Sequence, residues 1–236
     1  MPSLALKPPL KETTFLLKLT TWVPLLKSAD VDDVKKSRRA PSRLATSELT
    51  PFPHVVIVGG GASGLGCADT LRTLGFAGKI TLLSSEPYPP IDRIKLSKAL
   101  ITDSSKILLR TDSILKELDI ELKHTTVTNV DVKAKNVITE DSRMVGYDKL
   151  VLATGGSPRN LPLPGFKELK GIYPLRTVPH AKDIVDATSG GKKKIVIVGT
   201  GFIGMEIAVA LSKENDVSVI GMETYPLYFS RLSQLY

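Results

Sequence analysis

Cysteine, histidine and aromatic residues are scarce in this chain of 236 residues. The single cysteine, Cys67, forms neither an internal disulfide nor a redox-active pair of thiols. One cysteine and three widely separated histidines also exclude a zinc or iron–sulfur site of the usual ligand spacing. Phe, Tyr and Trp make up only 6% of the chain, which argues against binding single-stranded nucleic acid by base stacking. We therefore expect no bound metal and no specific nucleic-acid partner.

Long apolar runs are missing too. The most apolar early stretch, residues 15–26, contains Lys18 and Pro24 and is too short to span a bilayer. We therefore expect no transmembrane segment. The start of the chain lacks a clean signal-peptide pattern, and the acidic residues at 30–33 weaken the case for a mitochondrial presequence. A mitochondrial and a cytoplasmic location both stay open.

Acidic residues are outnumbered, and the net charge is +8. Residues 1–50 alone hold nine Lys or Arg against five acidic residues and show no sustained hydrophobic period. We interpret them as a largely irregular leader or linker. A basic surface attracts acidic partners, such as an acidic electron-acceptor protein. The alternative is that these charges only keep the leader soluble.

Order is expected to begin near His54 with a β-α-β unit. Residues 54–58 form a continuous apolar run that is typical of a strand buried on both faces of a parallel sheet. Residues 62–75 carry apolar residues at helical spacing and end in glycine, and residues 79–83 form the next strand. A further buried strand is predicted at 149–154. The fold class is α/β, with a Rossmann-like doubly wound domain.

The turn after the first strand has the pattern Gly59-x-Gly61-x-x-Gly64. The first glycine permits the tight turn, the second lets a pyrophosphate approach the backbone, and the third lets helix and strand pack closely. The helix N-terminus then offers free N–H groups to the phosphates. An acid that binds the ribose is expected after the second strand. The predicted cofactor-binding residues here are Gly59, Gly61, Ala62, Ser63, Gly64 and Glu86.

The middle of the chain predicts smaller elements. Residues 87–91 form a proline-rich loop, residues 95–100 a short helical turn and residues 111–118 a helix. Strands are predicted at 121–132 and 136–139, which would form a small β-meander.

The first pattern then returns about 140 residues later. Residues 194–198 predict a strand, 202–212 a helix and 217–220 a strand. The predicted nucleotide-binding residues of this second turn are Gly199, Gly201, Phe202, Ile203 and Gly204.

We assign residues 51–167 to the first domain and 168–236 to the start of a second, NAD(P)H-binding domain. One β-α-β unit is less than a whole nucleotide-binding domain, so we expect the chain to be a fragment or shortened form of a longer protein. The second strand is followed by Gly221 and only later by Glu223. This leaves NADH and NADPH as alternatives.

Two such turns with a buried strand between them resemble the flavoproteins that have two dinucleotide-binding domains. The chain is most similar to their apoptosis-inducing-factor-like and ferredoxin-reductase-like branch over residues 53–225. Besides the first turn, the resemblance is carried by residues 92–98, 147–159 and 201–206. It implies an oxidoreductase that transfers hydride from NAD(P)H to FAD and electrons onward to an acceptor.

The resemblance also implies roles for single residues. Lys98 would lie near the reactive edge of the flavin, where a cation stabilises developing negative charge, and Glu206 would pair with it as the second catalytic residue. FAD contacts are implied for Arg93, Lys98, Val127, Ala153 and Arg176. Ile94 stands where the family has proline. Two alternatives remain: a non-catalytic form that binds FAD or a partner, and a truncated product without function.

Overall fold

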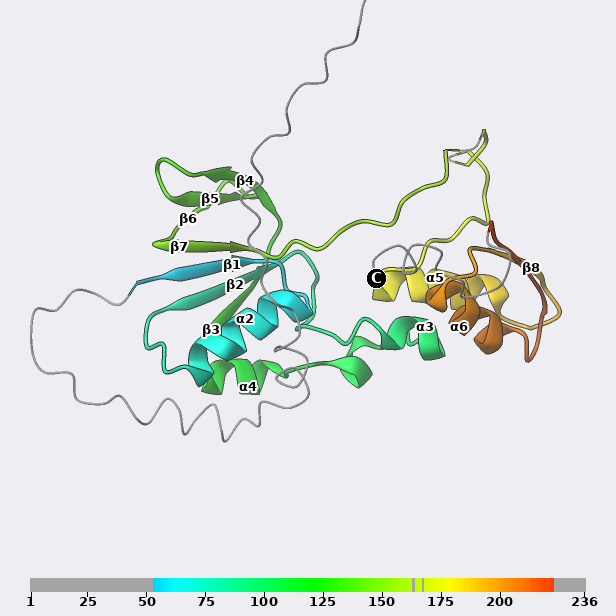
Figure 1. Ribbon diagram of the computed structural model, residues 1–236, viewed down its shortest axis with the longest axis horizontal. Coiled ribbons are helices and arrows are strands. Elements are labelled where there is room, and N and C mark those ends of the chain that lie inside the picture. Colours follow the sequence, from blue (N-terminus) through cyan, green and yellow to red (C-terminus); the bar gives the residue numbers. More distant parts are fainter. Residues whose placement is uncertain (1–52, 163, 167, 223–236) are drawn as a thin grey trace, which may run out of the picture.

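The computed structural model describes residues 53–162, 164–166 and 168–222. These residues form two α/β units that lie side by side, each built around parallel strands (Figure 1). The predicted leader, residues 1–50, lies outside the described residues. No helix among those described is both long enough and apolar enough to cross a membrane.

A four-stranded parallel sheet with the order β3-β2-β1-β7 organises the first unit. Its strands are β1 (Val55–Val58), β2 (Ile80–Ser84), β3 (Ile120–His124) and β7 (Lys149–Leu152). All four residues of β1 and all five of β2 are buried. The apolar runs predicted at 54–58 and 79–83 are therefore central strands, as expected.

Different elements cover the two faces of this sheet. Helices α2 (Ala62–Thr73) and α4 (Asp112–Glu117) cover one face, where Leu65 and Leu115 pack against Ile57 and Leu82. A three-stranded antiparallel meander covers the other face (Figure 1) and places Val137 against Val56. Its strands are β4 (Val127–Asp131), β5 (Asn136–Thr139) and β6 (Met144–Gly146).

The single strand predicted at 121–132 is in fact two strands in different sheets. The chain leaves the parallel sheet after His124 and enters the meander at Val127. At the break, the N–H of Thr125 donates to the carbonyl of Ser84, and the N–H of Thr126 donates to the Glu140 carboxylate. Alternation alone could not reveal this change of sheet, because both strands share the same period.

The second unit contains β8 (Lys194–Val198) and β9 (Asp216–Ile220), which pair in parallel, and helix α6 (Phe202–Leu211). These match the repeat predicted from the sequence. Helix α5 (Val178–Thr188) was not predicted. Its signals are nevertheless present, because Thr177 caps its first turn, Pro179 follows, and Ala181 and Ile184 continue a buried stripe.

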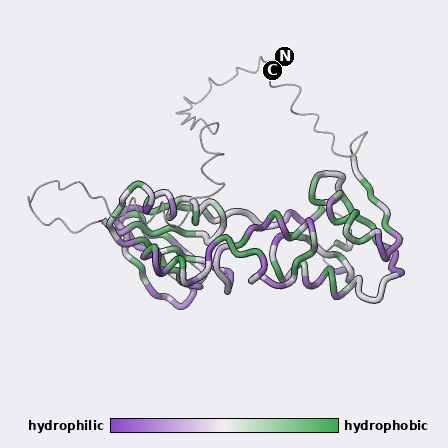
Figure 2. The backbone as a smooth tube through the Cα atoms, turned by 90° about the horizontal axis from the view of Figure 1, so that it is seen from below, coloured by the Kyte–Doolittle hydropathy of each residue, from purple (hydrophilic) through white to green (hydrophobic). Residues whose placement is uncertain are grey.

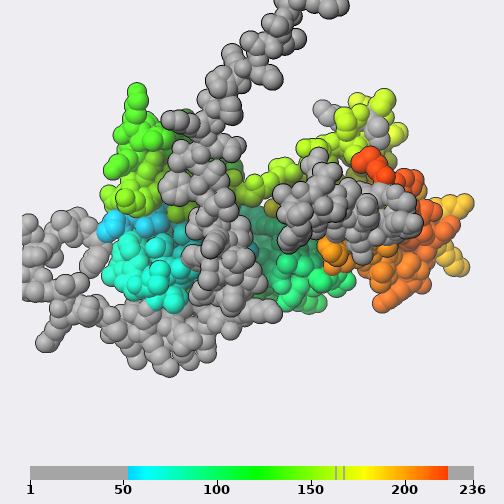
Figure 3. Space-filling view, viewed as in Figure 1, coloured from blue at the N-terminus to red at the C-terminus, as the bar shows by residue number. Residues whose placement is uncertain are grey.

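A segment of the first unit forms the contact with the second. It contains α3 (Lys95–Ala99) and the 3₁₀ helix η2 (Ser104–Ile107), and it lies between the two units in the ribbon and space-filling views (Figures 1 and 3). Leu96 and Ile107 pack with Val178 of α5, and Leu100 packs with Leu211 of α6. Viewed from below, the two units form an elongated shape (Figure 2).

Candidate functional site

The first glycine turn depends on close backbone packing. Gly59 has a φ of +121°, and a Cβ atom there would lie 2.0 Å from the carbonyl oxygen of Ala153. A Cβ at Gly64 would lie 2.0 Å from the carbonyl oxygen of Gly59. Both positions therefore require glycine, as the sequence pattern predicts. The same contact places Ala153, at the end of β7, directly beside the turn.

The N-terminus of α2 is open to a ligand. Gly61 is the N-cap residue, no side chain caps the helix, and its first turn holds no acidic residue. A Cβ at Gly61 would meet no atom within 4 Å, and both Ala62 and Ser63 are exposed. Free N–H groups beside an open space suit a pyrophosphate group. The residues present therefore fit the ADP portion of FAD.

Glu86 lies in the loop after β2, where a ribose-binding acid was predicted. Its carboxylate accepts two hydrogen bonds from Arg93, at 3.0 Å from Nη1 and 2.6 Å from Nη2. The hydroxyl of Tyr88 donates to the same carboxylate at 3.0 Å. Tyr88 was not singled out from the sequence, although it stands only two residues after Glu86.

Arg93 also joins Glu86 to Arg176, another predicted FAD residue. Its Nη1 donates to the carbonyl of Arg176 at 2.8 Å. The side chain of Arg176 in turn lies beside Gly155, because a Cβ there would be 3.3 Å from Arg176 Nη2. Arg176 thus lies near the Ala153 end of β7. Val127 begins β4, two residues after Thr125 bonds to the end of β2.

The second glycine turn repeats the geometry of the first. Gly199 has a φ of +114°, and a Cβ at Gly204 would lie 2.1 Å from the carbonyl oxygen of Gly199. A Cβ at Gly201 would meet no atom within 4 Å. Phe202 and Ile203, which begin α6, are 62% and 55% exposed. Beside this turn lies an apolar cavity of about 1110 Å³, lined by β8, α5 and the segment before α5.

The two predicted catalytic residues meet between the units. Lys98 Nζ lies 3.4 Å from Glu206 Oε1, and the hydroxyl of buried Ser97 donates to the other carboxylate oxygen of Glu206. These hydrogen bonds, first from Ser97 and then from Lys98, lower the pKa of Glu206. Glu206 is therefore a carboxylate that holds Lys98 by charge, and its partner Ser97 was missed by the sequence analysis.

Comparison with known proteins agrees with this geometry. Residues 53–234 match the model of the pyridine nucleotide-disulphide oxidoreductase family. The chain belongs to this family. Human apoptosis-inducing factor 3 is 41% identical over 175 residues, which cover 73% of this chain and 28% of that protein. Rhodocoxin reductase from Rhodococcus erythropolis is 36% identical over 178 residues, covering 73% of this chain and 41% of the reductase.

The solved structures give the same result. The crystal structure of the ferredoxin reductase for the CYP199A2 system from Rhodopseudomonas palustris has a TM-score of 0.70 at 28% identity. The match covers 77% of this chain and 46% of that chain. The Rossmann-like α/β fold and the predicted membership in this flavoprotein family are confirmed. The expected cofactors, FAD and NAD(P)H, are those of the family. The chain spans less than half the length of these relatives.

The pairing register of the strands lets equivalent positions in the two units be compared. Val58 of β1 pairs with Leu83, and Val198 of β8 pairs with Ile220. Glu86 stands three residues after Leu83, and Glu223 three residues after Ile220. By this count Glu223, rather than Gly221 directly after the strand, is the counterpart of Glu86 in the sequence. Glu223 itself lies outside the described residues.

Proposed function

We propose that this chain belongs to an NAD(P)H-dependent flavoprotein oxidoreductase and supplies its FAD site together with the first part of its nicotinamide-nucleotide site. The observation that carries the proposal is the contact of 3.4 Å between Lys98 and Glu206. One residue comes from the unit of the first glycine turn and the other from the unit of the second. Two nucleotide sites that share a charged pair at their interface suit electron transfer between two nucleotides.

Each part of the FAD site has a distinct task. The N–H groups at the start of α2 bind the pyrophosphate, and Glu86 accepts from a ribose hydroxyl. When bound, FAD supplies the chemistry that accepts hydride from a nicotinamide and releases electrons to an acceptor. Lys98 contributes a fixed positive charge between the units, and Glu206 holds that charge in place.

We propose that the acceptor is a small electron-carrier protein. The names of the rhodocoxin and ferredoxin reductases to which this chain is similar support this class of partner. The net charge of +8 favours an acidic carrier. A dithiol mechanism needs two cysteines, but Cys67 is the single cysteine of these 236 residues. Burial also raises the pKa of its thiol, which makes it less reactive.

We propose NADH as the preferred reductant. An acid at the end of the second strand accepts from the ribose 2′-hydroxyl and repels a 2′-phosphate. The proposal is supported by Glu223, which stands as many residues after Ile220 of β9 as Glu86 stands after Leu83 of β2.

The test begins with the purified chain and added FAD. We expect a yellow protein that retains FAD after gel filtration and loses its flavin absorbance when NADH is added without oxygen. A folded protein that takes up no FAD refutes the proposal. Protein that is insoluble and colourless would instead indicate a product without function.

A second candidate is a non-catalytic form that binds FAD and a partner. It is favoured by the β8–β9 sheet, whose side chains alternate along each strand between exposed on one face and partly buried on the other. Val196, Val198 and Ile220 of that face are each more than half exposed. Exposed apolar patches mark protein–protein contacts. A yellow protein that neither NADH nor NADPH can bleach would favour this candidate.

A further inference from the structure

Tyr88 connects the FAD site of the first unit with the start of α5 in the second. Its hydroxyl donates to the carboxylate of Glu86 at 3.0 Å. Its ring packs on a cluster formed by residues of both units, including Leu96 and Val178. Val178 is the first residue of α5. One side chain therefore contacts both the predicted ribose acid and a helix N-terminus.

The hydrogen bond from Tyr88 matters because the carboxylate of Glu86 can accept only a limited number of hydrogen bonds. A carboxylate has about four lone-pair sites, two on each oxygen. Tyr88 and Arg93 Nη1 fill both sites on Oε1, and Arg93 Nη2 fills one on Oε2. One site on Oε2 remains for a ligand hydroxyl. Tyr88 and Arg93 together thus fix how the carboxylate is turned and leave the open site on Oε2.

The protonation state of Tyr88 keeps the arrangement constant. Burial, and then the neighbouring Glu86 carboxylate, raise the pKa of Tyr88 to about 12. The phenol therefore donates throughout the physiological range. A second link runs in parallel, because Arg93 also donates to the carbonyl of Arg176, just before α5. Glu86 is tied to this region at two points.

We propose that Tyr88 is a positioning residue that energetically couples occupancy of the FAD ribose subsite at Glu86 to the seating of α5. The inference rests on the proposed FAD site and assigns that site a structural effect on the second unit. Coupling between two sites is reciprocal: a ligand that fixes Glu86 steadies α5, and a seated α5 favours binding of the ligand.

The test uses hydrogen–deuterium exchange of α5 in the whole chain, with and without saturating FAD. In the wild type, we expect FAD to slow exchange across residues 178–188. Tyr88→Phe keeps the ring and its packing but removes the hydroxyl. We expect it to raise the Kd for FAD about three- to tenfold and to lose most of the FAD-dependent protection of α5.

The matched control is Tyr147→Phe. Tyr147 packs against the apolar cluster between the parallel sheet and the meander, which includes Val56 and Val137 and no residue of α5. We expect this variant to match the wild type in both measurements. A double variant tests the route: in a Glu86→Gln background, Tyr88→Phe should produce a much smaller further change in Kd. A purely structural role for Tyr88 would instead give additive effects.

The outcomes are separable. If the wild type binds FAD but Tyr88→Phe shows the same Kd and the same protection of α5, the coupling is wrong and the proposed function stands. Additive effects in the double variant also overturn the coupling. If the folded wild type binds no FAD, the proposed function fails and the coupling fails with it.

Discussion

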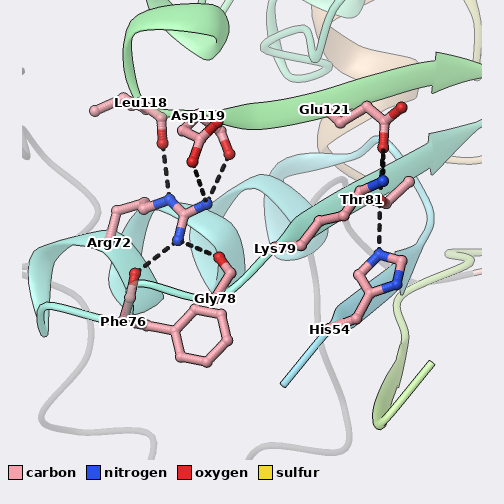
Figure 4. A network of polar contacts seen from close by, with 9 residues as sticks. All are labelled: His54, Arg72, Phe76, Gly78, Lys79, Thr81, Leu118, Asp119 and Glu121. Atoms are coloured by element: carbon pink, nitrogen blue, oxygen red, sulfur yellow. Dashed lines mark hydrogen bonds and ion pairs between the residues drawn. The ribbon is translucent and has the colours of Figure 1, made fainter. Parts of the chain in front are cut away.

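Arg72 offers a stringent test of how this fold holds α2, the helix that follows the first glycine turn. Its side chain is fully buried and donates to four backbone carbonyl groups, in the turn after α2 and at the junction of α4 and β3 (Figure 4). The acceptors are Leu118 at 2.7 Å, Phe76 at 2.6 Å, Gly78 at 2.8 Å and Asp119 at 2.6 Å. Replacing Arg72 with Met keeps much of the volume but removes every donor.

The structure sets the size of the effect. The bonds to Leu118 and Gly78 are buried, whereas those to Phe76 and Asp119 are partly exposed and can be replaced by water. Each buried carbonyl left without a donor costs about 1–3 kcal/mol. We therefore expect Arg72→Met to lower the free energy of unfolding by about 2–6 kcal/mol, a large share of the typical 5–15 kcal/mol for a domain. The ion pair with exposed Asp119 adds little.

The assay is urea denaturation followed by circular dichroism. Arg72→Lys should fall between Met and the wild type, because one ammonium cannot reach all four carbonyl groups. The control is Arg143→Ala, since Arg143 is 82% exposed and pairs with Asp141 on the surface; we expect a change within about 0.5 kcal/mol. If Arg72→Met differs from the wild type by less than about 1 kcal/mol, the carbonyl network does not stabilise the fold as argued.

Three further predictions concern the site and the pH response. Gly61→Ala should leave the free energy of unfolding unchanged but weaken FAD binding about tenfold. Gly64→Ala should also destabilise the fold, because its Cβ would meet a backbone oxygen. Equal unfolding curves for the two variants would contradict this expectation. Glu206→Gln should slow flavin reduction by NADH about tenfold without changing the Kd for FAD, and an unchanged rate would remove Glu206 from the mechanism. Burial, and then Lys79, lower the pKa of His54, so its contribution to stability is complete above about pH 6.5 and is lost as the pH falls through its lower folded pKa. In urea titrations between pH 7.5 and 5, His54→Asn should flatten this pH dependence. An unchanged pH profile would show that His54 is not the group responsible.

Much of the fold could be predicted from the sequence, because its signals are local. Apolar runs at 54–58 and 194–198 and glycines at fixed spacing indicated both β-α-β units, and the structure has them at nearly the same bounds. The three-residue strand β6 was missed because it is too short to show a period. The division of the chain at residue 168, and the nucleotide contacts and catalytic roles of all the predicted site residues, stay predictions.

Contacts between residues that lie far apart in the sequence could not be predicted from local patterns. Ser97 and Glu206 are 109 positions apart, and Arg93 and Arg176 are 83 apart. The resemblance to a family suggested that Lys98 and Glu206 pair, but nothing in either segment indicates Ser97 as a partner. Arg72 likewise reads as an ordinary charged residue of an amphipathic helix, and only the fold shows that it is buried.

The sequence by itself determined which segments are predicted to bind nucleotides, because a glycine turn between a strand and a helix exposes N–H groups whatever surrounds it. Only the tertiary structure decided how those segments work together. Packing of α3 against α6 brought Lys98 to Glu206, and the apolar cluster shared with α5 brought Tyr88 to Val178 as well as to Glu86. Such contacts depend on where whole elements pack, and that is set by burial of apolar faces throughout the chain rather than by any local spacing.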